Sequence, residues 1–188
     1  LVLEAEVSGS PPMVAQRTAA LYIGGTAELL EECRPLLNAI TAQYAHLGDY
    51  GSAVAMKLIA NYLLTIHTLA AAEAINLGAR AGLDPQLVAD VIKLGAGNSA
   101  MFTIRAPLMA SRNFSPALGS FGTLEKYLKL GEALTHQVGS ASPLFSTAAP
   151  YFYRALEGGM QDLDIAAVIE LLENDTAHTK TEKANHDH

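Results

Sequence analysis

The longest apolar pattern in the chain runs from Gly51 to Gly82 and predicts one long helix with apolar side chains on nearly every side. No charged residue stands between Leu58 and Ala72. A helix of this kind is buried in a core or crosses a membrane. The uncharged run is shorter than the roughly 18 residues that a span needs, and polar residues such as Asn61 and Thr65 interrupt it. The pattern therefore predicts the central helix of a soluble helical domain, buried on all sides.

Residues at the two ends of this helix suit its start and its stop. Ser52 can accept a hydrogen bond from the free backbone N–H groups of the first turn. Gly82 can end the helix in the left-handed conformation that only glycine adopts at low cost. We therefore predict Ser52 as the N-cap and Gly82 as the C-terminal stop.

The pattern before and after this helix differs. Short strands are predicted over 1–7, 19–23 and 41–47, with a turn over 8–12 and a helix over 27–37 that Thr26 caps. After Gly82 the pattern is helical, with helices predicted over 85–94, 101–109, 123–138, 143–156 and 165–172, the last capped by Asp164, and a polar tail over 173–188. Three short strands are too few for a complete nucleotide-binding sheet, which has about six.

Composition narrows the range of partners and compartments. With 188 residues and 50% hydrophobic content, the chain can fill a sizeable core. Its net charge of −7, without a cluster of Lys and Arg, argues against nucleic acid or an anionic membrane as the main partner. Cys33, the single cysteine, cannot form an internal disulfide, and no signal peptide opens the chain, so a cytoplasmic protein is predicted. Histidines lack metal-ligand spacing, and His178, His186 and His188 lie in the polar tail, so no metal is predicted.

Lys57 is a charge near the start of the apolar helix, and Asn61 stands one turn later on the same face. Its aliphatic stem can pack while its ammonium group reaches water, which is the structural interpretation. The functional interpretation is a general acid or base, because burial and the nearby positive helix end favour loss of the proton. Asn61 can then hold a substrate oxygen beside it. Both interpretations stay open on the pattern alone.

A glycine pair at Gly95 and Gly97 resembles part of a phosphate-binding loop. The dinucleotide fingerprint needs a preceding strand, a third glycine and an acidic residue about 20 positions later. This pair follows a predicted helix, so a tight turn is the better interpretation.

Several stretches together resemble the β-hydroxyacid dehydrogenases related to 3-hydroxyisobutyrate dehydrogenase, and the resemblance covers the chain to about Leu172. The family's substrate-binding segment is usually written APVSGG and its catalytic segment GxGxxxKxxNN. The matching stretches are Glu4-Ala5-Glu6-Val7-Ser8-Gly9-Ser10, Gly51-Ser52-Ala53-Val54-Ala55-Met56-Lys57 with Asn61, Ala71-Ala72-Glu73-Ala74, Gly82-Leu83-Asp84-Pro85, Gly95-Ala96-Gly97-Asn98-Ser99-Ala100-Met101-Phe102 with Arg105, and Gly159-Met160-Gln161-Asp162-Leu163-Asp164. The fifth is most similar to the L-threonate dehydrogenase branch.

The resemblance implies a mainly α fold. Residues 1–48 would be the C-terminal part of a Rossmann-type domain, and residues 49–172 an all-helical catalytic and dimerisation domain similar to the C-terminal domain of 6-phosphogluconate dehydrogenase. The enzyme would use NAD or NADP to interconvert a small β-hydroxy acid and its semialdehyde or keto acid. Lys57 would be the general acid or base. Ser8, Gly9 and Ser10 would bind the substrate carboxylate, and Asn61 would orient the reacting oxygen.

The sequence also departs from the family pattern. Glu6 stands where the family has Pro, Ser10 and Ala53 replace glycines, Ala60 replaces the first Asn of the pair, and Tyr127 replaces Asp. These changes concern cofactor contacts and substrate choice.

Lys126 resembles the lysine of the family's KDL segment, which approaches the cofactor. Counting back from Ser142-Pro143 places Lys126 at that position, whereas counting forward from Phe114 places Glu125 there. We assign the cofactor contact to Lys126, and a solvated helix lysine is the alternative.

The glycine-rich cofactor loop with which the family begins has no counterpart here. We therefore expect either a truncated chain or a sheet whose other half comes from elsewhere, and in both cases a chain that is inactive alone. Two alternatives remain. An imine reductase shares the architecture but commonly lacks a lysine at the position of Lys57. A non-catalytic helical dimerisation module would use the apolar helix for self-association. In either case a homodimer or homotetramer through the helical domain is expected.

Overall fold

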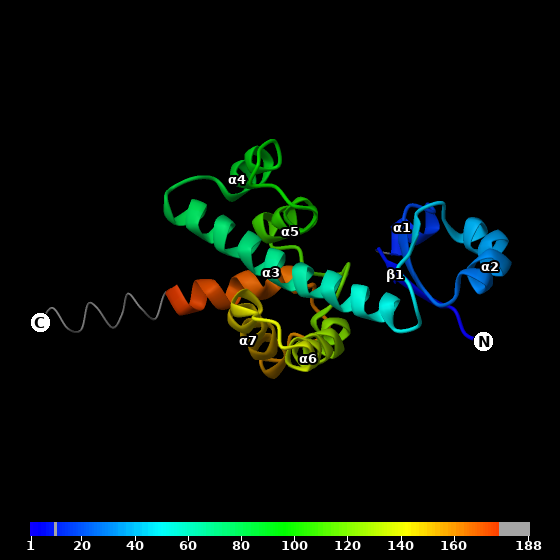
Figure 1. Cartoon of the computed structure of the whole chain (residues 1–188). Helices are drawn as coiled ribbons and strands as arrows, with labels where there is room; N and C mark the ends of the chain where they lie inside the picture. Colours follow the sequence, from blue (N-terminus) through cyan, green and yellow to red (C-terminus); the bar gives the residue numbers. More distant parts are fainter. Residues whose placement is uncertain (10, 177–188) are drawn as a thin grey trace, which may run out of the picture. The chain divides into compact units, whose positions relative to one another are not determined.

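The computed structural model describes residues 1–9 and 11–176. It is mainly helical with one small sheet, as the sequence predicts (Figure 1). The elements in chain order are β1 (Glu4–Ser8), α1 (Pro11–Ala15), β2 (Ala20–Gly24), α2 (Ala27–Ile40), β3 (Tyr44–His46), α3 (Ser52–Arg80), α4 (Pro85–Ile92), α5 (Ala100–Ser111), α6 (Phe121–Val138), α7 (Pro143–Glu157), the 3-10 helix η1 (Ile165–Ala167) and a helix over residues 168–176.

The chain forms two compact units. Unit 1 consists of residues 1–62 and 129–140, and unit 2 consists of residues 63–128 with the described residues after 140.

The sheet of unit 1 has the strand order β1-β2-β3. β2 runs antiparallel to β1, with Val7 opposite Leu21, and parallel to β3. Leu21 and Ile23 of the central strand are buried, and they pack with Leu30 and Leu37 of α2. The spacing of seven between the two α2 leucines places them two turns apart on one face, which is how the helix covers the sheet.

Two details of this region differ from the prediction. Within the expected turn over 8–12, the chain enters α1 at Pro11, because proline suits the first helical positions, where no N–H bond is needed. α2 continues to Ile40, beyond the predicted end at residue 37. Its predicted cap is confirmed, since the Thr26 hydroxyl accepts from the Leu29 N–H at 3.4 Å.

The long helix α3 is confirmed over 29 residues, and Gly82 ends it with a φ of +86°. The Leu83 N–H donates to the Gly78 carbonyl at 3.0 Å, which satisfies an otherwise unpaired carbonyl of the last turn. The predicted role of Ser52 is wrong. Its hydroxyl is buried without a hydrogen-bond partner among the described residues, and the Glu4 carboxylate instead accepts from the Gly51 N–H at 2.7 Å. A side chain from β1 therefore takes the place of the local cap.

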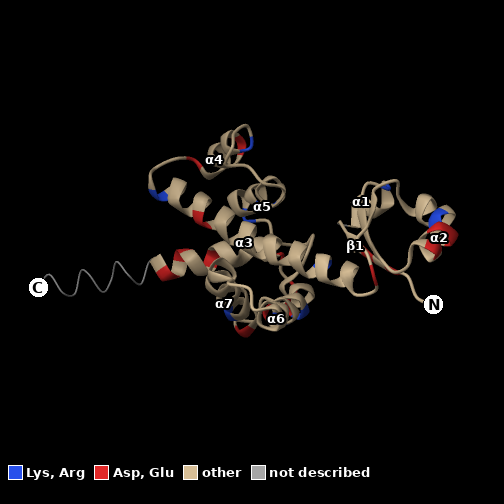
Figure 2. Ribbon diagram, in the orientation of Figure 1, with Lys and Arg blue, Asp and Glu red and all other residues tan. Residues whose placement is uncertain are grey.

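The prediction that α3 is buried on all sides is also wrong for the described chain. Thr68 and Ala72 are fully buried, but Ile59, Leu63 and Leu77 are 48%, 46% and 72% exposed. Figure 2 shows few charged residues along this helix. By length and composition alone α3 could cross a membrane, a test that the core helix of a soluble protein also passes. The pattern established that the helix is apolar, but neighbouring elements cover only part of it.

Unit 2 contains the helices that the sequence predicts, and side-chain caps begin two of them. Asp84 accepts from the Gln86 N–H at 2.6 Å at the start of α4, and Ser99 accepts from the Phe102 N–H at 3.0 Å at the start of α5. The glycine pair at 95 and 97 lies between these two helices rather than after a strand. The interpretation as a turn is therefore confirmed.

The core of unit 2 contains a buried ion pair between Arg105 of α5 and Asp164, whose side chains are 6% and 0% exposed. Asp164 Oδ2 accepts from Arg105 Nη1 at 2.7 Å and from the N–H groups of Leu118 and Gly119. Its Oδ1 accepts from the Ala166 N–H at 2.9 Å, so Asp164 is the predicted N-cap and also joins three segments. Arg154 of α7 forms an exposed ion pair with Asp175 in the last described helix.

Candidate active site

In unit 1, the start of α3 meets β1 in a way that places Lys57 beside the predicted substrate-binding segment. Lys57 lies on the second turn of α3, is half-buried, and donates from Nζ to the Val7 carbonyl. β1 is an edge strand of the described sheet, so carbonyls on its outer side are open to such a donor. Val7 immediately precedes Ser8. The structure therefore brings Lys57 together with the segment that begins at Ser8, across 50 residues of sequence.

Asn61 is half-buried one turn after Lys57, as the spacing predicts. Its Nδ2 donates to the Lys57 carbonyl at 2.9 Å. This bond holds the amide against its own helix and limits its rotation, on the face that Lys57 occupies.

Ser8 and Gly9 are the end of β1 and the residue after it. Ser8 is half-buried and Gly9 is exposed. A Cβ at Gly9 would lie 2.8 Å from the Ala19 Cβ, so the two chain segments approach too closely there for a larger residue. Ser10, the third predicted carboxylate contact, lies outside the described residues.

Lys126 belongs to unit 2, where it is exposed on α6. Its Nζ lies 4.8 Å from the centre of the Tyr127 ring, a distance at which the cation attracts the ring face. Tyr127, which departs from the family pattern, is thus a direct neighbour of the predicted cofactor residue. The assignment of the cofactor contact to Lys126 stays a prediction.

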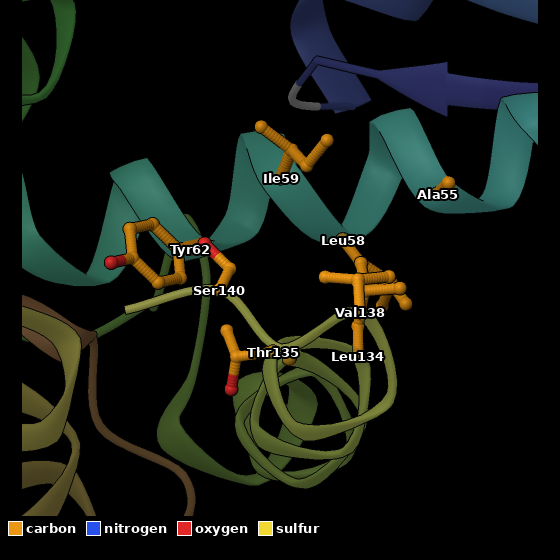
Figure 3. A pocket seen from close by; sticks show the side chains of 9 residues that line it. Ala55, Leu58, Ile59, Tyr62, Leu134, Thr135, Val138 and Ser140 are labelled. Atoms are coloured by element: carbon orange, nitrogen blue, oxygen red, sulfur yellow. The ribbon is translucent and has the colours of Figure 1, made fainter. Parts of the chain in front are cut away.

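A hollow of about 390 Å³ lies elsewhere in unit 1, between the first half of α3 and the second half of α6 (Figure 3). It is lined by Ala55, Leu58, Ile59, Tyr62, Gly131, Leu134, Thr135, Val138 and Ser140. At about 100° per residue, Leu58 and Tyr62 point roughly 100° and 140° away from Lys57 around the helix. The hollow is therefore on a different side of α3 from the predicted catalytic face.

The described residues include no group of three or more His, Cys, Asp or Glu side chains that could hold a metal ion. The histidines at 178, 186 and 188, on which the prediction of no metal partly rests, lie outside them. In the part of the chain that the structure describes, no strand leads through a GxGxxG loop into a helix, the unit that binds the pyrophosphate. The described residues thus lack the pyrophosphate-binding unit, whereas Lys57 lies beside the segment that is predicted to bind the substrate.

Comparison with known proteins identifies the family. A family model described as "NAD-binding of NADP-dependent 3-hydroxyisobutyrate dehydrogenase" matches residues 51–172. The chain belongs to this 3-hydroxyisobutyrate dehydrogenase family. The resemblance stated from the sequence is thereby confirmed, and so is the expectation that the family binds NAD or NADP.

Relatives of known name agree with this assignment. The chain is 30% identical to glyoxylate/succinic semialdehyde reductase 2 of Arabidopsis thaliana over 92% of its own length and 48% of the relative's. It is 34% identical to L-threonate dehydrogenase of Cupriavidus necator over 91% of its own length and 58% of the relative's. A crystal structure of 3-hydroxyisobutyrate dehydrogenase from Salmonella typhimurium superposes with a TM-score of 0.84 at 30% identity, covering 90% of this chain and 59% of that one. The chain thus spans about half to three fifths of the length of these relatives.

Sequence reasoning predicted Lys57, Asn61, Ser8 and Gly9 as site residues. The structure places Lys57 beside the Ser8–Gly9 segment and bonds Asn61 to the Lys57 carbonyl. Sequence reasoning missed Glu4, which binds the start of α3. The sequence did contain a signal for Glu4. Glu4 and Glu6 are two residues apart in β1, so both carboxylates lie on the same face of the strand as Ser8.

Proposed function

We propose that the protein to which this chain belongs is an NAD(P)-dependent oxidoreductase that interconverts a small β-hydroxy acid and its semialdehyde or keto acid. The observation that carries the proposal is the hydrogen bond from Lys57 Nζ to the Val7 carbonyl, next to Ser8 and Gly9. It puts a proton-carrying group beside backbone and hydroxyl donors suited to a carboxylate. We propose that residues 1–188 alone are inactive, because the described part lacks the phosphate-binding unit.

Lys57 acts as the general acid or base in this proposal. In the oxidation direction its amine accepts the proton of the substrate hydroxyl, while the carbon–oxygen double bond forms and the hydride departs. In the reduction direction its ammonium returns a proton to the carbonyl oxygen. The nicotinamide supplies the hydride acceptor or donor. The Val7 carbonyl can hold Nζ in place in both states, because an amine and an ammonium group both donate N–H hydrogen bonds.

The remaining predicted residues position the substrate. Ser8 and Gly9 bind the carboxylate through a hydroxyl and a backbone N–H, with Ser10 as a third donor, and Asn61 orients the reacting oxygen. The chain has a net charge of −7, so attraction of an anionic substrate must come from these local donors and from Lys57. Lys126 would contact the cofactor.

The names of the relatives support a small acid that carries a hydroxyl or carbonyl group, with no preference for the β position. Glyoxylate and succinic semialdehyde are short aldehyde acids, and threonate is a short hydroxy acid. Each combines a carboxylate with an oxygen-bearing carbon that is adjacent to it or a few bonds away, which suits a site with carboxylate donors beside a proton carrier. Assays against a panel of short hydroxy acids can identify the preferred substrate among them.

The test is Lys57→Ala in the full native chain, assayed with NAD and NADP against a panel of short hydroxy acids. We expect kcat to fall at least 10²-fold, the lower end of what a positioned acid or base contributes. Lys93→Ala, which removes a partly exposed lysine just after α4, is the matched control and should retain activity. Circular dichroism must show that both variants are folded. Turnover near the parent level in folded Lys57→Ala would refute the proposed role.

We further propose that the protein is a homodimer or homotetramer through its helical part. On α4, Leu87 and Val91 are each 55% exposed and one turn apart, and Leu94 just beyond is 87% exposed. Contiguous apolar surface of this kind marks interaction sites.

Sedimentation at micromolar concentration should show a dimer or larger species, and Leu87→Lys with Val91→Lys should dissociate it. The control is Gln86→Lys on the same helix. A monomeric parent would contradict the proposal. A stable dimer without turnover on any hydroxy acid would favour the dimerisation-module alternative.

A further inference from the structure

Glu4 joins β1 to the start of α3, the two elements that carry Ser8 and Lys57. Its Oε2 accepts from the Gly51 N–H at 2.7 Å, across 47 residues of sequence. A carboxylate suits this place, because the first N–H groups of a helix lack partners within the helix and the helix start is positive. The bond therefore fixes one point of β1 against one point of α3.

The surroundings of the carboxylate are shaped around it. A Cβ at Gly24 of β2 would lie 2.4 Å from Glu4 Oε2, 3.0 Å from Ser52 Oγ and 3.1 Å from the Ala53 nitrogen. Only glycine at this position leaves room for the carboxylate. Ser52, the local candidate for the same capping task, has a buried hydroxyl without a partner in the described chain.

A second tie runs parallel to the first. Lys57 Nζ donates to the Val7 carbonyl, three residues after Glu4 on the strand and six residues after Gly51 on the helix. Three residues of strand span about 10 Å, and six residues of helix span about 9 Å. The two separations match, so the tie at Glu4 sets the register at which Lys57 meets the end of β1.

We infer that Glu4 is a positioning residue for Lys57. By anchoring the start of α3 to β1, it holds the Lys57 nitrogen at the Ser8–Gly9 segment, where the substrate is proposed to bind. The inference rests on the proposed function, because positioning matters only if Lys57 carries the proton. A displacement of about 1 Å in such a site can cost up to 10²-fold in rate.

The test compares three variants of the full native chain by kcat, KM and the primary deuterium isotope effect on hydride transfer. Glu4→Ala should lower kcat about tenfold with little change in KM, because Ser8 and Gly9 still bind the carboxylate. Its isotope effect should be at least as large as the parent's, as expected for a slowed chemical step. Glu4→Gln keeps an acceptor oxygen for the Gly51 N–H and should restore most of kcat. Gly24→Ala should lower kcat as Glu4→Ala does, with the carboxylate still present.

One further measurement and a control variant separate positioning from folding. Hydrogen exchange at the Gly51 amide should be about tenfold faster in Glu4→Ala than in the parent, and close to the parent in Glu4→Gln. Glu32→Ala, which removes an exposed carboxylate from α2 of the same unit, is the control and should match the parent throughout.

Several results would overturn the inference. One is parent-like kcat in Glu4→Ala while Lys57→Ala is inactive, which would leave the proposed function intact. Another is a loss in Glu4→Ala that Glu4→Gln does not relieve and that parallels the unfolded fraction, since this would make Glu4 a stability residue only. If Lys57→Ala itself keeps its turnover, the proposed function fails and the positioning role fails with it.

Discussion

Replacing Asp164 by alanine should destabilise the protein more than any other single loss of charge in the described chain. The side chain is completely buried and accepts four hydrogen bonds, one from Arg105 and three from backbone N–H groups. Its removal would leave the Arg105 guanidinium buried without a counter-charge. Burial lowers the pKa of Arg105 and Asp164 opposes that decrease, so the cation depends on this partner.

The magnitude follows from the cost of a broken buried pair. Removing one partner of such a pair costs about 3–5 kcal/mol, because the other charge stays in a poorly solvated place. Each backbone N–H left without an acceptor adds about 1–3 kcal/mol unless water replaces the carboxylate. Some water will enter, so we expect Asp164→Ala to lower the free energy of unfolding by about 4 kcal/mol. Asp164→Asn keeps acceptor capacity but loses the charge, and should cost about 2–3 kcal/mol.

The assay is urea unfolding of the full native chain followed by circular dichroism, with the slope of the transition compared between variants. Asp175→Ala is the control, because it breaks the exposed pair with Arg154, and such pairs contribute about 0–1 kcal/mol. A loss below about 1 kcal/mol for Asp164→Ala, or a loss no larger than that of Asp175→Ala, would refute the reasoning. An altered slope would indicate that the variant no longer unfolds in one cooperative step.

The remaining predictions concern glycines. Gly78 of α3 lies where a Cβ would stand 2.6 Å from a Val88 methyl group of α4, so Gly78→Ala should cost about 1–3 kcal/mol in thermal unfolding. Gly95→Ala, at an open position, is the control and should change stability by less than about 0.5 kcal/mol. Equal effects of Gly78→Ala and Gly95→Ala would show that the close contact with Val88 is unimportant. In Gly9→Ala the new methyl group would clash with Ala19 and shift the end of β1. The KM for the hydroxy acid should therefore rise about tenfold in steady-state kinetics. An unchanged KM would argue against carboxylate binding at Gly9.

The parts of the fold that depend on neighbouring residues in the sequence were predictable. Thr26 and Asp84 begin helices where the sequence predicts them, because each side chain can accept from an N–H two or three residues later. Gly82 ends α3 because only glycine takes its positive φ at low cost. Lys57 and Asn61 share a face because they are four residues apart. Each of these predictions needed only local geometry.

The parts that depend on distant residues were not predictable. The Glu4–Gly51 bond and the Arg105–Asp164 pair join residues 47 and 59 positions apart, and no periodicity indicates which of many acidic residues will be the partner. The exposure of Leu77 on α3 was not predictable either, because it depends on which distant elements cover the helix. A hydrophobic pattern shows that a face must be covered, whereas the covering element is decided by packing.

Ser52 shows how the two classes compete. By local rules a serine one residue after a glycine, at the start of a long helix, is a good N-cap. In the fold, Glu4 reaches the same helix start from β1 and supplies a full negative charge, which interacts more strongly with the helix end than a hydroxyl does. The serine then lies inside the first turn with its hydroxyl buried. A local cap would hold α3 only to its own loop, whereas a cap from β1 also fixes the helix against the strand that ends at Ser8. The replacement of one cap by the other is therefore what couples the start of the helix, and with it Lys57, to the proposed substrate segment.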